Sequence, residues 1–216
     1  MKDYRKIQIE LTDRKMKQMI DIPGEKIKEM DLHIYRYIEY IEWMGSYINK
    51  DMRILDIGCR DGAFLTLLRE KTEAWKLYGV EINETASMLA GDRGIKVYNI
   101  DAHDMTSLES NYFDLVCLTH FLEHTHNPKK ILNDVVRILK PKGLIFIEVP
   151  LEPRPSSHPT DGGHFHTFQR PQDLNDMLEV FRGSGYRPFT VKQKRDNKKN
   201  KWYRILVRKN MIGKKI

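Results

Sequence analysis

The sequence predicts an α/β fold in which a mainly parallel sheet carries helices on both faces. From residue 53 onward, short β-rich runs alternate with helical segments, which is typical of strand-helix-strand units. Before residue 51, apolar residues recur at steps of three and four, which indicates amphipathic helices. The last two β-rich runs are joined by a short polar connection, which predicts an antiparallel hairpin at the end of the sheet.

The expected elements follow in chain order. Five strands precede the final hairpin: Arg53–Ile57, Lys76–Glu81, Ile95–Ile100, Phe113–Thr119 and Gly143–Val149. Four helices are expected: Ala63–Lys71, Glu84–Asp92, Pro128–Leu139 and Pro171 to about Phe181. Asn127 and Pro128 support the third helix, because asparagine is a favoured N-cap and proline a favoured first helical residue. The hairpin is expected from Pro188–Lys194 and Trp202–Arg208.

Length and composition restrict the class of protein. A chain of 216 residues with 40% hydrophobic and 31% charged residues is long enough for one domain and too short for two large ones. Its apolar stretches fall short of the roughly 18 residues of a membrane span, and its first residues are too polar for a signal peptide. We therefore expect a soluble, cytoplasmic protein without a membrane span. Cys59 and Cys117 lack CxxC spacing and are expected to be reduced thiols.

A glycine-bearing turn between the first strand and its helix is the most informative segment. In open α/β sheets the ligand lies at the carboxyl ends of the strands, and Gly58 and Gly62 would allow the backbone to approach it. The turn alone is ambiguous, because Gly58, Arg60 and Ala63 also match the nicotinamide pattern GxGxxG/A with one substitution.

Three acidic residues follow or end strands near this turn. Glu81 ends the second strand, where a carboxylate can accept both ribose hydroxyls of a nucleoside. Asp101 follows the third strand and is placed to accept a hydrogen bond from an adenine amino group. Asp56, two residues before Gly58, is suited to ordering the turn or a bound ammonium group.

Five motifs follow one another along the chain: Asp56-Ile-Gly-Cys-Arg-Asp-Gly62, Val80-Glu-Ile82, Asp101-Ala102, Phe113-Asp-Leu-Val-Cys-Leu-Thr-His-Phe-Leu-Glu-His124 and Leu139-Lys-Pro-Lys-Gly143. Together they resemble the class I S-adenosylmethionine-dependent methyltransferases. Within that superfamily the Leu-Glu-His block, the Lys-Pro-Lys-Gly turn and Gly163-His-Phe-His-Thr-Phe-Gln-Arg-Pro-Gln-Asp-Leu174 resemble the ubiquinone-biosynthesis type and its small-molecule relatives. The resemblance covers about residues 38–208. It implies a Rossmann-like, doubly wound sheet of seven strands with an antiparallel last strand. It also implies three segments: N-terminal helices capping the site (1–50), the methyltransferase domain (51–209) and a basic tail (210–216).

The resemblance implies S-adenosylmethionine as cofactor and S-adenosylhomocysteine as product. Gly58 and Gly62 would face the methionine part, Glu81 the ribose, Asp101 the adenine, and Thr119 or His120 the sulfonium. The full set of expected cofactor-binding residues is Asp56, Gly58, Cys59, Arg60, Gly62, Glu81, Ile82, Asp101, Ala102, Thr119 and His120.

Arg60 departs from the family, which usually has glycine in the middle of this turn. If the position requires positive φ, a residue other than glycine costs about 1–2 kcal/mol. A second hypothesis is that the guanidinium pairs with the carboxylate of the cofactor.

Histidines supply the candidate bases. His120, Glu123 and His124 spell H-x-x-E-H, but the segment lies between a strand and a helix start, which disfavours a zinc peptidase helix. Small-RNA 3′-terminal 2′-O-methyltransferases look similar here and bind magnesium, but His120 stands where they have an acidic residue, so no metal is expected. Because an imidazole titrates near neutral pH, His120, His124 and His166 are the candidate catalytic bases. His166 lies in the long connection Pro150–Arg170, which is expected to form a lid.

The charge is concentrated at the C-terminus. Residues 190–216 carry eleven Lys and Arg and one Asp, which gives this segment a charge of +10. Residues 1–189 carry −3, so the net charge of the chain is +7. Such a segment is either a solvated hairpin or a binding surface for RNA or another polyanion. We expect methyl transfer to oxygen or nitrogen of a small-molecule acceptor. The alternatives are an RNA methyltransferase and a non-catalytic protein that binds S-adenosylmethionine.

Overall fold

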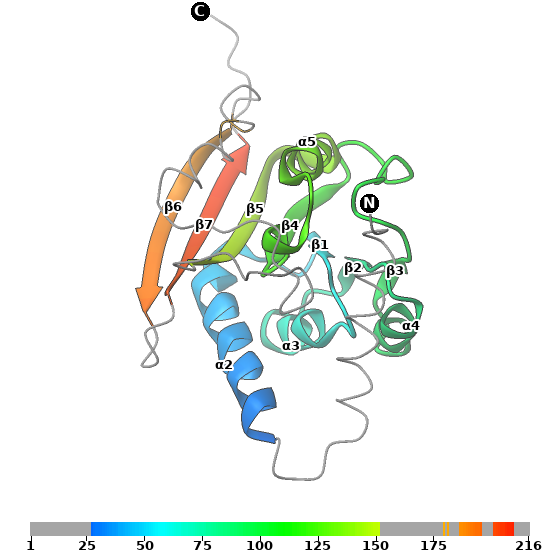
Figure 1. Ribbon diagram of the computed structural model, residues 1–216, viewed down its shortest axis with the longest axis vertical. Helices are drawn as coiled ribbons and strands as arrows, with labels where there is room; N and C mark the ends of the chain where they lie inside the picture. Colours follow the sequence, from blue (N-terminus) through cyan, green and yellow to red (C-terminus); the bar gives the residue numbers. More distant parts are fainter. Residues whose placement is uncertain (1–26, 152–178, 180, 182–185, 196–200, 210–216) are drawn as a thin grey trace, which may run out of the picture. The chain divides into compact units, whose positions relative to one another are not determined.

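Residues 27–151, 179, 181, 186–195 and 201–209 are described in the computed structural model of the protein (Figure 1). They form two compact units. The first contains residues 27–53 and 59–101, and the second contains residues 54–58 and the described residues from 102 onward. The lid connection with His166 lies outside the described residues apart from its first two residues, as do the tail 210–216 and most of the helix expected from Pro171. The division into segments 1–50, 51–209 and 210–216 stays a prediction.

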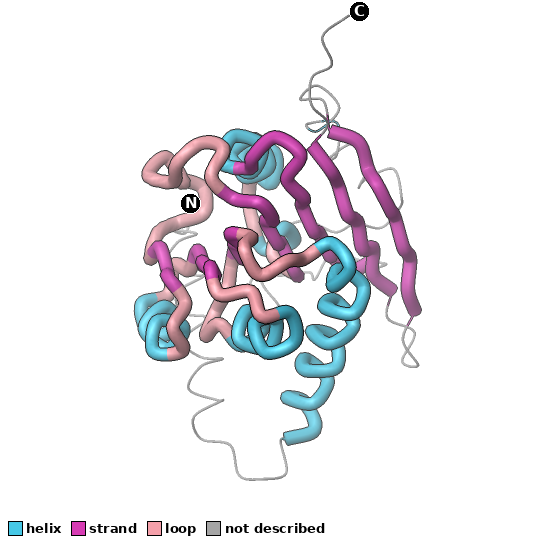
Figure 2. The backbone as a smooth tube through the Cα atoms, turned by 180° about the vertical axis from the view of Figure 1, so that it is seen from behind, coloured by secondary structure: helices cyan, strands magenta, loops and turns pink. Residues whose placement is uncertain are grey.

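The described part of the first unit consists of helices and one short pair of parallel strands. Its elements are α2 (Ile27–Met44), η2 (Gly45–Tyr47), α3 (Ala63–Thr72), β2 (Lys76–Val80), α4 (Glu84–Asp92) and β3 (Lys96–Tyr98). Helices α2 and α3 lie side by side (Figure 2), and the ring of Phe64 lies 5.5 Å from that of Tyr37 and 6.0 Å from that of Tyr40. The helical pattern of the N-terminal segment therefore reflects packing against the helix that follows the glycine turn.

The second unit is built on five strands. Its elements are β1 (Arg53–Ile57), β4 (Phe113–Thr119), η3 (Leu122–His124), α5 (Pro128–Ile138), β5 (Leu139–Leu151), β6 (Tyr186–Arg195) and β7 (Lys201–Lys209). β1, β4 and β5 pair in parallel, whereas β7 lies antiparallel between β5 and β6 (Figure 1). The predicted C-terminal hairpin is confirmed.

Helix α5 begins as the sequence predicts. The Asn127 side chain accepts a hydrogen bond from the Lys130 amide at 3.1 Å, and Pro128 occupies the first turn. The apolar face of the helix is fully buried, through Ile131, Leu132, Val135 and Ile138. Among the described residues, no helix combines the length and the apolar character needed to cross a membrane.

The junction between α5 and β5 differs from the prediction. The sequence predicted a helix to Leu139 and a strand only from Gly143, but α5 ends at Ile138 and β5 begins at Leu139. The backbone carbonyl of Ile138, which has no partner within the helix because it lies at its end, accepts the Tyr112 amide at 2.8 Å. Leu139 then pairs with Phe113, and a register shift follows before Leu144 pairs with Leu115. The expected turn is therefore an irregular part of a longer strand.

Candidate functional site

The glycine turn of the first unit is fixed by backbone hydrogen bonds. The Cys59 amide donates to the Val80 carbonyl at 3.1 Å, and the Gly62 amide donates to the Cys59 carbonyl at 2.9 Å. Gly62 has φ 76°, and a Cβ there would collide with the side chain of Ile95. Glycine is therefore required at the start of α3 for both conformation and space.

Glu81 is held against this turn. Its Oε2 accepts the Arg60 amide at 2.9 Å and its Oε1 accepts the Asn83 amide at 2.8 Å, while the Asn99 side chain donates to its carbonyl at 2.8 Å. Burial raises the pKa of this carboxyl, and the two amides and the Arg60 charge oppose that rise. A carboxylate offers about four acceptor positions, so Glu81 can still accept two hydroxyl groups.

Arg60 adopts the left-handed conformation, with φ 51°. The turn therefore does require positive φ at this position, as the comparison with the usual glycine suggested, and the arginine carries a conformational cost of about 1–2 kcal/mol. In return, this conformation points the Arg60 amide at Glu81. The guanidinium also attracts the Glu81 carboxylate.

A neighbouring ion pair was not predicted. The Arg93 Nη1 lies 2.6 Å from Oδ2 of Asp61 and donates to the Asp61 carbonyl at 2.7 Å. Arg93 follows the last residue of α4, so it ties the glycine turn to the end of that helix. In the sequence, the one local sign of this ion pair was Asp61, an acidic residue next to Arg60 in the turn.

In the second unit, β1 and β4 bring Asp56 and Cys117 opposite each other. Burial raises the pKa of the Cys117 thiol well above its ordinary value, and the Asp56 carboxylate adds to the effect. Cys59 and Cys117 are both buried, and neither takes part in a disulfide. Gly58 has φ 79°, and a Cβ there would lie 2.5 Å from Cδ2 of Phe121. The space left by this glycine therefore receives the Phe121 ring.

His120 follows β4 directly and contacts two buried carboxylates. Its Nε2 lies 2.9 Å from Oε1 of Glu148, and its Nδ1 lies 3.2 Å from Oε1 of Glu123. Glu148 also pairs through Oε2 with Nε of Arg204 from β7. His120 keeps 27% of its side chain exposed, whereas Glu123 and Glu148 are almost completely buried. We call these four residues the His120 cluster.

The carboxylates hold His120 in its charged form. Burial lowers the pKa of this imidazole, but the hydrogen bonds and charges of Glu123 and Glu148 outweigh burial and raise it to about 9. Burial acts to raise the pKa of Glu123, but the imidazolium outweighs it and holds that pKa below its ordinary value. The expectation that His120 titrates near neutral pH is therefore wrong.

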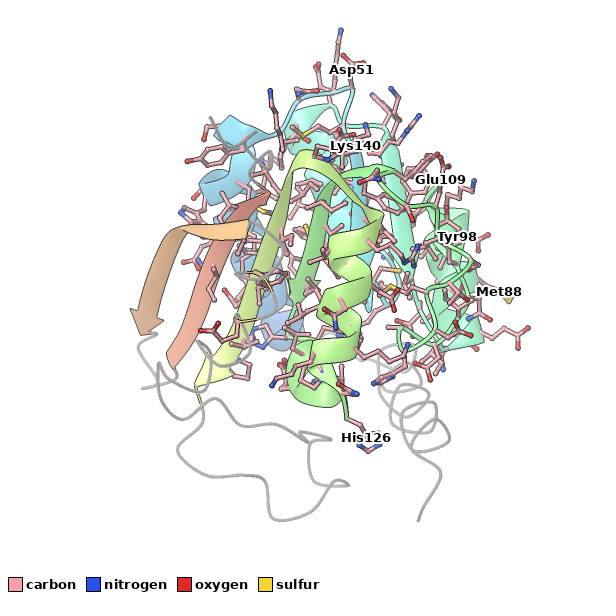
Figure 3. The ribbon with its side chains drawn as sticks, turned by 90° about the horizontal axis from the view of Figure 1, so that it is seen from above. Asp51, Met88, Tyr98, Glu109, His126 and Lys140 are labelled. Carbon is pink, nitrogen blue, oxygen red and sulfur yellow. The ribbon has the colours of Figure 1, made fainter. Side chains whose placement is uncertain are left out.

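Two further histidines, His124 and His126, follow His120 closely in the sequence but differ from it in burial and contacts. Leu122–His124 form one 3-10 turn, so H-x-x-E-H does not lie on a long helix. His124 is half-buried at the end of this turn, and its charge acts on Glu123. His126 is exposed and points away from the start of α5 (Figure 3).

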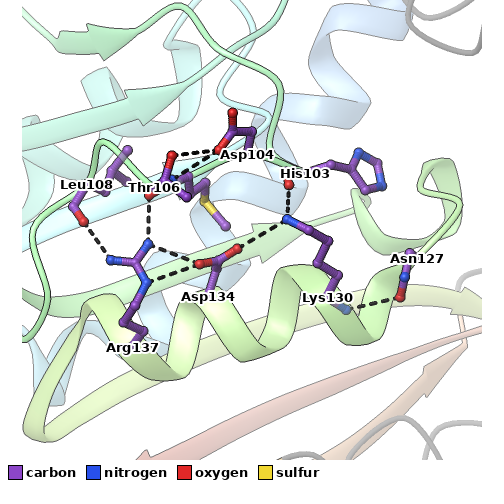
Figure 4. A network of polar contacts seen from close by, with 9 residues as sticks. His103, Asp104, Thr106, Leu108, Asn127, Lys130, Asp134 and Arg137 are labelled. Atoms are coloured by element: carbon purple, nitrogen blue, oxygen red, sulfur yellow. Dashed lines mark hydrogen bonds and ion pairs between the residues drawn. The ribbon is translucent and has the colours of Figure 1, made fainter.

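The loop after Asp101 is fixed by helix α5 (Figure 4). Arg137 donates from Nη2 to the Met105 carbonyl and from Nη1 to the Leu108 carbonyl, both at 2.7 Å. Asp134 accepts from Arg137 at 3.0 Å and lies 3.7 Å from Nζ of Lys130. The loop that begins with Ala102 is thus held by side chains that the sequence did not indicate.

Comparison with known proteins identifies the family. Residues 29–188, well over half of the chain, match a family described as a methyltransferase domain. The chain belongs to this methyltransferase domain family. S-adenosylmethionine is the cofactor that membership of this family implies.

Proteins that are similar to this methyltransferase domain in sequence or in structure are themselves described as methyltransferases. A ubiquinone biosynthesis O-methyltransferase of Rickettsia felis is 29% identical over 115 residues, which are 51% of this chain and 47% of the relative. The chain spans about half the length of such curated relatives. A possible histamine N-methyltransferase of Thermotoga maritima has a similar structure, with a TM-score of 0.68 and 17% identity over 96% of this chain and 100% of that one. A methyltransferase of Methanosarcina mazei has a TM-score of 0.60 and 19% identity over 78% and 97%.

These likenesses confirm the predicted fold class, a Rossmann-like and mostly parallel α/β sheet with an antiparallel last strand. The structure distributes the predicted cofactor residues over both units. The first unit contains Cys59, Arg60, Gly62, Glu81, Ile82 and Asp101, and the second contains Asp56, Gly58, Ala102, Thr119 and His120. Glu81 fits a nucleoside ligand, because it is a buried carboxylate already oriented by two amides.

The sequence analysis missed Asn83, Glu148 and Arg204. Asn83 had a usable signal, since it is an asparagine directly before a predicted helix, and its side chain accepts the Ala86 amide at 2.8 Å. Glu148 and Arg204 had a weaker signal, namely a charged residue inside an apolar strand.

Proposed function

We propose that this methyltransferase domain transfers the methyl group of S-adenosylmethionine to oxygen or nitrogen of a small-molecule acceptor. The observation that carries the proposal is the Glu81 carboxylate, buried beside the glycine turn and held by the Arg60 and Asn83 amides. The names of two similar proteins, a ubiquinone biosynthesis O-methyltransferase and a possible histamine N-methyltransferase, support acceptors of this size and chemistry.

The roles of the site residues follow from their chemistry. Glu81 accepts the ribose hydroxyls, Asp101 accepts from the adenine amino group, and Ile82 and Ala102 provide apolar contacts at its sides. The turn with Gly62 admits the methionine part. The cofactor supplies an electrophilic methyl group on a sulfonium, so the protein contributes mainly alignment and exclusion of water.

An acceptor hydroxyl or amine loses a proton as the new bond to carbon forms. His120 is a poor base at neutral pH, because it is already protonated and both ring nitrogens face carboxylates. His124, the other candidate among the described residues, is therefore the proposed base that accepts the proton of the acceptor. His166 lies outside them and keeps its place as an alternative base.

The first experiment is a calorimetric titration with S-adenosylhomocysteine, and with NAD as the control for the glycine pattern. We expect micromolar binding of S-adenosylhomocysteine alone, equivalent to about −8 kcal/mol. Glu81→Gln should weaken this binding at least tenfold, because it loses the charge that strengthens the hydrogen bonds. Glu84→Gln, at the exposed start of α4, is the matched control and should bind normally.

Acceptors are then tested by formation of S-adenosylhomocysteine from S-adenosylmethionine with phenols, catechols and primary amines, and with RNA as a separate class. Turnover with RNA alone, lost steeply as salt rises, would replace the small-molecule proposal. Tight S-adenosylhomocysteine binding without turnover on any of them would favour a non-catalytic binding protein. Binding of NAD in place of S-adenosylhomocysteine would reject the assignment of the site.

A further inference from the structure

The His120 cluster joins residues that are far apart in the sequence. Thr119 on β4 pairs with Glu148 on β5, and Glu148 pairs with Arg204 on β7. The Glu148 side chain therefore lies between the end of β4 and the antiparallel strand. It contacts the imidazole with one oxygen and the guanidinium with the other.

His120 is bound to Glu148 twice. Its backbone amide donates to the Glu148 carbonyl at 2.9 Å, in addition to the contact between the imidazole and the carboxylate. His120 also has φ 48°, a left-handed conformation that residues other than glycine adopt at a cost. The two contacts with Glu148 hold the backbone in this unfavourable conformation.

The charges of the cluster balance only when His120 is protonated. Glu123 and Glu148 are two buried carboxylates, and Arg204 offsets one of them. A neutral imidazole would leave one of these buried negative charges poorly compensated, which is strongly disfavoured. The His120 imidazole, 3.2 Å from Oε1 of Glu123, is the main group that offsets the burial of this carboxylate, and the charge of His124 adds to its effect.

We infer that His120 is a positioning residue: an imidazolium held between Glu123 and Glu148 that fixes the turn after β4, with Arg204 acting on this turn through Glu148. The turn continues into Phe121, whose ring occupies the space beside Gly58. Release of His120 would thus also move the ring from the end of β1. The inference rests on the proposed function for its ligand readout, because the family resemblance implies that Thr119 or His120 faces the sulfonium of the cofactor.

The charged groups that contact the imidazole, directly or through Glu148, come from three elements. Glu123 lies on η3, Glu148 on β5 and Arg204 on β7, and His124 acts on Glu123 from the same turn. Loss of the Glu148 charge should make the imidazole easier to deprotonate, whereas loss of a distant carboxylate should not. Asp114, on β4 and paired with Lys140 near the surface, provides that control.

The test compares the titration of His120 with the affinity for S-adenosylhomocysteine, using the full chain. The titration of the imidazole is followed by NMR on protein with labelled histidine. The signal of His120 is identified because it is absent from the spectrum of His120→Gln. We expect an imidazole pKa near 9 in the parent protein, a clearly lower pKa in Glu148→Gln, and no change in Asp114→Asn. Affinity should fall about tenfold as His120 loses its proton, and this fall should move to lower pH in Glu148→Gln.

The ligand's amino group titrates in the same range, so each profile is compared with His120→Gln, in which only the ligand's own titration remains. An imidazole pKa near that of free histidine would overturn the inference. So would a shifted imidazole pKa with an unchanged affinity profile. If Glu148→Gln does not fold, Arg204→Lys replaces it, and the affinity profile must then follow the altered imidazole pKa. Absence of S-adenosylhomocysteine binding would reject the proposed function, while the NMR titration would still report on the charge of His120.

Discussion

The two units fix their candidate site residues by different chemistry. In the first, the Glu81 carboxylate is held by two backbone amides, those of Arg60 and Asn83. In the second, His120 and Glu148 are held by other charged side chains, which lie deep in the sheet. The first arrangement tolerates loss of one hydrogen bond, since the amides keep their places in the chain. The second depends on a balance of buried charges, and removal of one charge leaves another without compensation.

This difference predicts where substitutions are most damaging. Arg204→Met should lower the free energy of unfolding by about 3–5 kcal/mol, because it removes one partner of a buried ion pair and leaves the Glu148 carboxylate with less compensation for its charge. Urea denaturation measures the effect. Lys140→Met is the control, since the partly exposed pair of Lys140 with Asp114 should contribute no more than about 1 kcal/mol. Equal effects of the two substitutions would show that the buried charges of the second unit contribute no more to stability than its partly exposed ion pair.

The charge of His120 predicts a dependence of stability on pH in the neutral to alkaline range. The folded-state pKa of about 9 lies above the ordinary value of 6.5, so the folded state holds the proton more tightly. The stabilisation is complete below about pH 6.5 and is lost as the pH rises toward 9, a loss of about 3 kcal/mol.

Thermal or urea unfolding between pH 6 and 10 measures this loss. His120→Gln should be less stable at pH 6 but should show a much flatter profile. A parent profile that stays as flat as that of His120→Gln would show that the imidazole is not held charged.

The two units also differ in what the sequence could reveal. The glycine turn, Glu81 and the N-cap of α5 were predictable, because each depends on residues close in sequence or on a strand end. Left-handed Arg60 could be anticipated only as a condition, since sequence alone does not give φ. Glu148 and Arg204 are 56 residues apart, and their pairing depends on the order and register of β5 and β7. The charge of His120 follows from that register, which explains why the sequence did not indicate an imidazole held protonated by two carboxylates.

Gly62 tests how strictly the first unit requires its backbone conformation. Gly62→Ala should lower the free energy of unfolding by about 2 kcal/mol, because φ is 76° and Ile95 would have to move. Gly91→Ala in α4 is the matched control. It has open space around a Cβ and should stabilise the helix by about 0.5–1 kcal/mol. Substitutions of the same chemistry should therefore have opposite signs, and two stabilising results would mean that the turn is not strained.

Substitution of Arg60 has the smallest expected effect on stability, but it tests most directly whether the first unit depends on backbone amides rather than on side-chain charge. Arg60→Gly removes the cost of φ 51° but adds the flexibility of glycine to the unfolded chain, so we expect stabilisation of no more than about 1 kcal/mol. Glu73→Gly, at the end of α3 with φ 56°, should show the same effect without any contact with the turn.

Calorimetry with S-adenosylhomocysteine then separates conformation from charge at Arg60. Because Arg60 serves Glu81 through its backbone amide, the glycine variant keeps that hydrogen bond and should bind almost as well as the parent protein if the guanidinium has no ligand role. A loss of about tenfold or more, with stability still increased, would instead show that the guanidinium pairs with the ligand's carboxylate. In that case the first unit, like the second, would depend on a side-chain charge, and the arginine would be kept for binding at a cost in stability.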